Sequence, residues 1–156
     1  MLAIDIPGFG SLRLEHLLLD YNGTLAIDGR LIAHAAPLLH KISRTLQIHV
    51  VTADTFGLVA GELAGLPLQL VVMGSTDQAE AKVEFVRRLN AKSVVAIGNG
   101  RNDCKMVELA ALDIAVLQRE GAAQATVRTA DLVVPSILDA LELLQHPLRL
   151  TATLRS

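Results

Sequence analysis

LLLDYNGTL, residues 17–25, joins three consecutive leucines to a polar turn that contains a glycine. An apolar run without alternating polar residues is typical of a strand that is buried on both faces of a parallel sheet. Asp20 follows this run directly. Because ligands of open parallel sheets bind beyond the carboxyl ends of the strands, the stretch predicts a central strand that carries Asp20 to a binding site.

Short apolar runs of this kind recur along the chain. Together with the first, they occupy residues 14–19, 47–51, 68–73, 93–97, 113–117 and 131–134. The segments between them have apolar residues at helical spacing, most clearly residues 31–42 and 83–89. Helix starts are expected at Asp77, Asn102 and Ser136. This alternation predicts an α/β fold with a doubly wound, Rossmann-like parallel sheet.

Two segments depart from the alternation. Residues 2–14 contain two strand-like pieces on either side of Pro7 to Gly10, which predicts an N-terminal β-hairpin. Asp28-Gly29 between apolar pairs predicts a second tight hairpin, a small flap directly after the Asp20 turn. The sequence contains no internal repeat and no linker-like tract, so we expect residues 1–156 to form a single domain.

Composition argues against several classes of protein. Hydrophobic residues make up 51% of the sequence, yet no run approaches the roughly 20 residues that a membrane span needs. The first ten residues have no basic part, so we expect no signal peptide and a cytoplasmic location. Cys104, the only cysteine, excludes an internal disulfide, and we expect it to be buried in a helix.

Charge and hydrophobicity also bear on partners. A formal net charge of −2 without a basic cluster argues against nucleic acid as a partner. Only 19% of the residues are charged, so apolar surface is expected to remain exposed. We therefore keep a homo-oligomer as a hypothesis and expect phosphate-bearing or other small molecules as partners.

Polar residues follow four of the apolar runs. They are Asp20 to Leu25, Thr52, Lys82 in the helix after the third run, and residues 98–103 with the sequence GNGRND. In this order they resemble the four motifs of the haloacid dehalogenase superfamily: D-x-D-G-T-(L/V), a threonine or serine, a lysine, and G-D-x-x-x-D. Within the superfamily, the sequence is most similar to the phosphorylation domain of P-type ATPases and to small soluble phosphatases like it.

This resemblance implies a Mg²⁺-dependent phosphatase or phosphotransferase whose nucleophile is Asp20. A carboxylate that attacks phosphorus forms an acyl phosphate and divides hydrolysis into two easier steps. Thr52 and Lys82 would complete the catalytic set and bind the phosphate, because the attack of an anion on a phosphate needs cations and hydrogen-bond donors. The backbone N–H groups of Tyr21, Asn22 and Gly23 would form an anion-binding nest. Oxygen ligands for Mg²⁺ would come from Asp20, the Asn22 carbonyl, Asn99 and Asp103.

Two asparagines depart from the family pattern. Asn22 stands where the phosphatases have an aspartate that acts as general acid and base, and an amide cannot transfer that proton. Since general acid–base catalysis contributes about 10²- to 10⁴-fold in rate, we expect slow turnover. Asn99 replaces the first aspartate of the fourth motif and is expected to weaken metal binding. The alternative is a phosphate-binding or regulatory domain that has lost catalysis.

The lengths of the connections limit what can cover the site. The segments between Asp20 and Thr52 and between Thr52 and Lys82 are too short for a cap domain. An open site suits a macromolecular phosphate, or a small one that a neighbouring subunit covers.

Lys92 and Lys105 are weaker candidates than Lys82 for the lysine of the third motif. Residues 54 and 55, Asp and Thr, are expected to cap the helix that follows Thr52.

Overall fold

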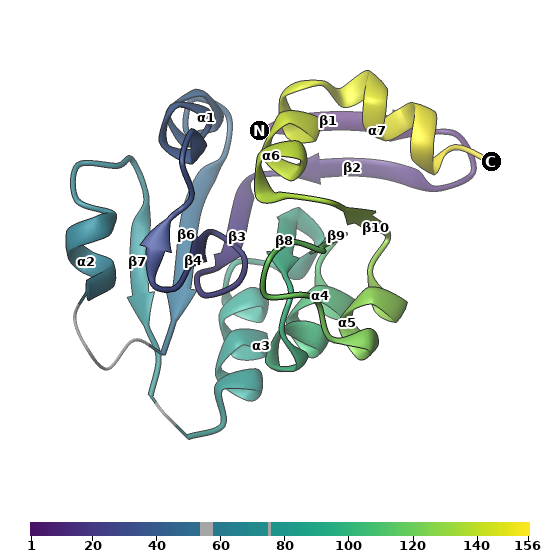
Figure 1. Cartoon of the computed structure of the whole chain (residues 1–156). Helices are drawn as coiled ribbons and strands as arrows, with labels where there is room; N and C mark the ends of the chain where they lie inside the picture. Colours follow the sequence, from purple (N-terminus) through teal and green to yellow (C-terminus); the bar gives the residue numbers. More distant parts are fainter. Residues whose placement is uncertain (54–57, 75) are drawn as a thin grey trace.

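A six-stranded parallel sheet forms the centre of the molecule (Figure 1). The computed structural model describes residues 1–53, 58–74 and 76–156, so the cap expected at residues 54 and 55 lies outside the described residues. In spatial order the strands are β10 (Leu132–Val134), β9 (Leu112–Val116), β8 (Val94–Gly98), β3 (His16–Asp20), β6 (Gln47–Thr52) and β7 (Gln69–Val72). Each predicted apolar run overlaps one of these strands to within one or two residues at either end, which confirms the predicted sheet.

The direction in which the chain adds strands reverses at β3. β3 pairs in parallel with β6 on one side and with β8 on the other. The chain builds outward to β7 from the first side and to β10 from the second. Such a reversal opens a crevice at the carboxyl ends of the two central strands, where doubly wound sheets bind their ligands.

Helices cover both faces of the sheet (Figure 1). On one face lie α1 (Ala35–Ile42), α2 (Leu58–Glu62) and α6 (Ile137–Gln145), and on the other α3 (Gln78–Arg88), α4 (Cys104–Leu109) and α5 (Gln124–Thr129). Short 3-10 turns precede β8 (Ala91–Ser93) and α4 (Arg101–Asp103). No described helix is long and apolar enough to cross a membrane.

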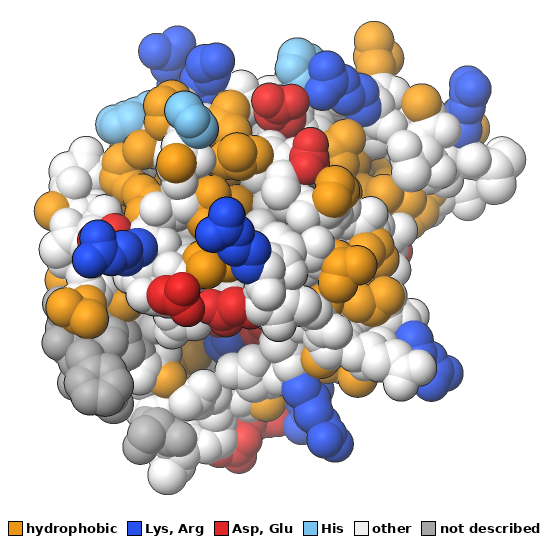
Figure 2. Space-filling model, viewed as in Figure 1, with side chains coloured by type: hydrophobic (Ala, Val, Ile, Leu, Met, Phe, Trp, Pro, Cys, Tyr) orange, Lys and Arg blue, Asp and Glu red, His pale blue; other side chains and the backbone are white. Residues whose placement is uncertain are grey.

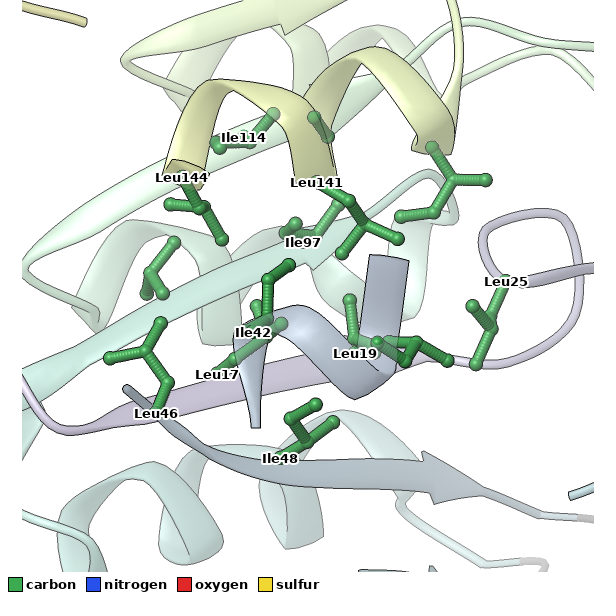
Figure 3. Packing of buried hydrophobic residues seen from close by; sticks show 14 of the residues in the cluster. Leu17, Leu19, Leu25, Ile42, Leu46, Ile48, Ile97, Ile114, Leu141 and Leu144 are labelled. Atoms are coloured by element: carbon green, nitrogen blue, oxygen red, sulfur yellow. The ribbon is translucent and has the colours of Figure 1, made fainter. Parts of the chain in front are cut away.

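The leucines of β3 explain the missing alternation in the sequence. Leu17 and Leu19 pack in the core beneath α1 and α6, as Figure 3 shows. Leu18 points to the opposite face and packs with residues of α3 and α4. All three side chains are fully buried. Burial of each contributes about 1.5–3 kcal/mol, so β3 is held from both sides.

Both predicted hairpins are present. β1 (Leu2–Ile6) and β2 (Gly10–Leu14) pair antiparallel, and α7 (Pro147–Leu154) packs against β1. The flap consists of β4 (Ala26–Ile27) and β5 (Arg30–Leu31). Its turn residues, Asp28 and Gly29, have φ angles of 51° and 76°. A type I′ turn requires positive φ at both places, which is why Asp-Gly identified the turn.

The expected helix starts at Ser136 and Asp77 are present, whereas Asn102 lies within the 3-10 turn that precedes α4. Ser136 caps α6, where its hydroxyl accepts the Asp139 N–H. Asp77 precedes α3 as predicted, but it has a left-handed φ of 53° and its side chain makes no capping bond to a described residue. Cys104, which the sequence predicts to be buried, is the first residue of α4 and is only half-buried.

The described part of the chain contains no cap domain. Between Asp20 and Thr52 it has only the flap and α1, and between Thr52 and Lys82 only α2, β7 and the start of α3. Large exposed hydrophobic side chains include Leu58, Val72 and Leu148. On the face in Figure 2, hydrophobic side chains are interspersed with charged and polar ones.

A buried carboxyl group lies at the end of the sheet away from the crevice. Asp113 belongs to β9 and is 5% exposed, and its Oδ1 atom has no hydrogen-bond partner among the described residues. Burial, helped by the charges of Asp131 and Glu108, raises the pKa of Asp113 to about 8. The folded protein therefore favours the protonated form of this group near neutral pH.

Asp113→Asn is expected to stabilise the protein at pH 7–8. In the unfolded chain the carboxyl ionises near the ordinary aspartate pKa of 3.8, whereas in the folded protein it keeps its proton up to about pH 8. Between these values the unfolded state binds fewer protons, so stability falls as the pH rises. The gain in melting temperature should grow from pH 5 to pH 8, and Glu142→Gln, at an exposed position of α6, serves as control. A gain that does not vary with pH would contradict this account.

Candidate active site

A cavity of about 410 Å³ opens at the carboxyl ends of β3, β6 and β8. It is lined by Asp20, Asn22, Thr52, Ala53, Gln78, Lys82, Asn99, Gly100, Asn102 and Glu120. These residues come from segments that are far apart in the sequence and meet at the point where the strand order reverses. The cavity thus brings together five of the predicted site residues, while the remaining three, Tyr21, Gly23 and Asp103, lie outside its lining.

Lys82 lies at the centre of the buried charges. Its Nζ atom donates to Asp20 Oδ1 at 2.7 Å and to Asp103 Oδ1 at 2.5 Å. The residue is 2% exposed, whereas most lysines on helices are solvated. Burial alone would lower the pKa of Lys82, but the two carboxylates raise it above its usual value. Lys82 is therefore a permanent buried cation.

The rival lysines lie elsewhere. Lys105 is exposed, and its ion pair with Glu80 measures 3.4 Å. Lys92 lines the cavity beside Asp113, at the opposite end of the sheet. Neither is among the residues that line the cavity around Asp20.

The charges around Asp20 are not balanced by protein groups alone. Burial and the neighbouring Asp103 carboxylate raise the pKa of Asp20 to about 7, although Lys82 acts in the opposite direction. Two carboxylates share one ammonium group, so full ionisation leaves an excess negative charge. A site with this excess suits an additional cation.

Asp103 organises the turn that follows β8. Its Oδ2 atom accepts the backbone N–H groups of Asn99 at 3.1 Å and Gly100 at 2.8 Å. A Cβ atom on Gly98 would lie 2.7 Å from the Asp103 side chain, so a glycine is required there. The same carboxylate holds this turn with one oxygen atom and Lys82 with the other.

The turn at residues 21–26, called the nucleophile turn after the role predicted for Asp20, is closed by its own backbone. The Tyr21 carbonyl accepts N–H groups from Thr24, Leu25 and Ala26 at 3.2, 2.9 and 2.9 Å. Gly23 has a φ of 78°, and its N–H donates to Ala26 O at 2.8 Å. Its N–H is thus engaged within the turn, while its missing side chain leaves room for Asn99.

The Tyr21 side chain points into the core. It is fully buried, and its hydroxyl donates to the Gly29 carbonyl at 2.9 Å. This bond ties the flap turn to the residue after Asp20. Any contact of Tyr21 with a phosphate would therefore use its backbone.

Several contacts of the site were not anticipated from the sequence. The buried Thr24 hydroxyl lies 3.5 Å from Asp20 Oδ2 and 3.2 Å from Asn99 Oδ1. Gln118 and Glu120 reach the site from the loop between β9 and α5. The only signal for this loop was its place after a predicted strand, at the same edge as the other motifs.

The donor atoms fit a hard divalent cation such as Mg²⁺. The oxygens of Asp20 and Asn99 both lie within reach of the Thr24 hydroxyl, and such ligands suit Mg²⁺ better than softer metals. No group of three His, Cys, Asp or Glu residues able to hold a metal occurs in the described chain. A cation here would rely on amide, carbonyl and water oxygens beside the carboxylates.

Comparisons with known proteins agree with this geometry. No protein-family model matches the chain. An uncharacterized protein of Methanocaldococcus jannaschii is 43% identical over 84 residues, which cover 53% of this chain and 90% of that protein. The chain therefore belongs to the same family as this archaeal protein.

Solved structures place the fold within a wider group. A Legionella pneumophila protein assigned to subfamily IIIA of the haloacid dehalogenase hydrolases has a TM-score of 0.72 at 16% identity. The match covers 90% of this chain and 87% of the Legionella chain. The 3-deoxy-D-manno-octulosonate 8-phosphate phosphatase of Moraxella catarrhalis, solved with magnesium, phosphate and the sugar, has a TM-score of 0.69 at 18% identity, with coverages of 85% and 86%. A cobalt-bound Haemophilus influenzae phosphatase of the same name reaches 0.71 at 12% identity, with coverages of 86% and 88%. The chain has the haloacid dehalogenase fold.

Lys82→Met is expected to destabilise the protein strongly. The substitution leaves the Asp20 and Asp103 carboxylates buried without their cation, and breaking a buried ion pair costs about 3–5 kcal/mol. Lys105→Met is the matched control, because exposed ion pairs contribute about 0–1 kcal/mol. Urea denaturation of both variants measures the difference. Equal losses in the two variants would show that Lys82 does not hold the site together.

Proposed function

We propose that this chain, which has the haloacid dehalogenase fold, is a Mg²⁺-dependent phosphatase that acts through a phospho-Asp20 intermediate. The observation that carries the proposal is the Asp20 carboxylate at the open end of β3, paired with buried Lys82 beside a cavity of about 410 Å³. A reactive carboxylate next to a fixed cation is suited to attack a phosphoryl group.

The reaction proceeds in two steps. An Asp20 carboxylate oxygen attacks phosphorus, and the ester oxygen leaves with the bonding electrons and takes up a proton. A water molecule then attacks the acyl phosphate, gives up a proton, and releases inorganic phosphate and free Asp20. Lys82 offsets the negative charge that develops, and Asp103 positions Lys82.

The remaining predicted residues have supporting roles in the proposal. Thr52, at the end of β6, lines the cavity and offers a hydroxyl to the phosphoryl oxygens. Asn22 lines the same space, and its backbone would bind the phosphate together with that of Tyr21, whereas the Gly23 N–H of the predicted nest is bonded to Ala26 O. Asp20, the Asn22 carbonyl, Asn99 and Asp103 would hold Mg²⁺, which when bound supplies the positive charge that the site lacks.

The proposed substrate is a small phosphate monoester. The similar phosphatases from Moraxella catarrhalis and Haemophilus influenzae are named for a sugar phosphate, which favours a small ester over a macromolecular one. Residues 1–156 would act as one domain in the cytoplasm, where Cys104 would stay reduced.

The first test is formation of the phosphoryl enzyme. With p-nitrophenyl phosphate and Mg²⁺, the protein should release p-nitrophenol and carry an acid-stable, hydroxylamine-labile phosphoryl group. Asp20→Asn should abolish both, and removal of Mg²⁺ with EDTA should suppress them until the metal is restored. Turnover that survives in Asp20→Asn would refute the proposal.

A second test addresses the residue that departs from the family. Asn22→Asp supplies a carboxylic acid in the lining of the cavity and should raise turnover of alkyl phosphates, by up to about 10²-fold. The effect on p-nitrophenyl phosphate should be smaller, because its leaving group needs less protonation. If neither wild type nor Asn22→Asp turns over either ester while phosphate still binds, the non-catalytic alternative is favoured.

A further inference from the structure

The proposed reaction requires a proton donor, and the side-chain amide of Asn22 cannot serve as one. The first step must protonate the leaving oxygen, and the second must take a proton from water. Among the described residues that line the cavity, the titratable ones are Asp20, Lys82 and Glu120. Asp20 is the nucleophile, and Lys82 is bonded to two carboxylates. Glu120 is the group that remains.

The loop that carries Glu120 is bonded to the nucleophile turn on its N-terminal side. The Gln118 Nε2 atom donates to the carbonyls of Gly23 at 2.9 Å and Thr24 at 2.6 Å. The Oε1 atom of the same side chain accepts the Ile137 N–H at 2.9 Å, at the start of α6. Gln118 is thus held at both ends, and it fixes the position of the loop two residues before Glu120.

The loop is bonded to the turn after β8 on its C-terminal side. The Asn99 side-chain amide donates to the Gly121 carbonyl at 3.0 Å, and the Ala123 N–H donates to the Asn99 carbonyl at 2.8 Å. Glu120 therefore lies between two anchored points, one on each of the segments that form the candidate site. These bonds fix the position of the loop, so the backbone of Glu120 needs little reorganisation when a substrate binds.

The Glu120 carboxylate lies over the nucleophile turn. Its Oε2 atom is 2.8 Å from the point where a Cβ atom on Gly23 would be, so any larger residue at that position would displace it. Its Oε1 atom accepts the backbone N–H of Asp28 in the flap at 3.4 Å. The side chain is exposed, which allows proton exchange with water.

We propose that Glu120 is the general acid and base of this site. It takes the role of the family's aspartate, whose position is occupied here by Asn22. This inference rests on the proposed function. In the first step the protonated carboxyl gives its proton to the ester oxygen as the bond to phosphorus breaks. In the second step the resulting carboxylate takes a proton from the water that attacks phospho-Asp20, which restores the acid.

The test compares Glu120→Gln with wild type and with Glu142→Gln, an exposed glutamate of α6 paired with Arg149. With an alkyl phosphate such as glycerol 3-phosphate, Glu120→Gln should lower kcat by about 10²- to 10⁴-fold, and Glu142→Gln should have no effect. With p-nitrophenyl phosphate, Glu120→Gln should still release one equivalent of p-nitrophenol, followed by slow decay of the phosphoryl enzyme.

Three outcomes separate the possibilities. Wild-type rates in Glu120→Gln, with phosphoryl enzyme formed, would overturn the assignment of Glu120 alone. The absence of phosphoryl enzyme in wild type would overturn the proposed function and this inference with it. Recovery of alkyl phosphate turnover in the double variant Asn22→Asp, Glu120→Gln would show that Glu120→Gln removes an acid and does not act by distorting the loop.

Discussion

The bonds of Lys82 to Asp20 and Asp103 are the constraint on which the site depends. They join α3, β3 and the turn after β8, three segments that the chain order keeps far apart. Taking these charges out of water is costly, and a buried ion pair often contributes no net stability. The trio is therefore better explained by what it does for Asp20 than by what it does for folding. Its cost must be offset by the apolar layers of the sheet.

Those layers also determine where the charges meet. Leu17 and Leu19 bury one face of β3 and Leu18 the other, so a shift by one residue would move each leucine into the opposite layer of the core and displace Asp20 from the edge of the sheet. Its parallel register with β6 and β8 then brings the ends of the three strands to the same edge. Asp20, Thr52 and the turn beyond Gly98 lie together for this reason.

Much of this arrangement could be predicted because it depends on local patterns. Unbroken apolar runs identified the strands, Asp28-Gly29 identified the flap turn, and the motif order placed Asp20 and Lys82 at one site. The contacts of Gln118, and the bond between Thr24 and Asn99, could not be found in this way, because they join segments that are distant in the sequence. The inward direction of the Tyr21 side chain likewise follows from tertiary packing against the flap, which no local pattern encodes.

The two asparagines and Glu120 can be understood as a redistribution of negative charge. Asp20 and Asp103 already share one buried ammonium group, and the pKa of Asp20 is raised even so. Carboxylates in place of Asn22 and Asn99 would add charge beside a site that is short of cations, and would make it depend more on bound metal. An acid on the exposed β9–α5 loop avoids most of this penalty, because water solvates its charge and the loop anchors still hold it over the nucleophile turn. A neutral amide at residue 22 and a carboxylate at residue 120 are therefore compatible parts of the proposed catalytic site.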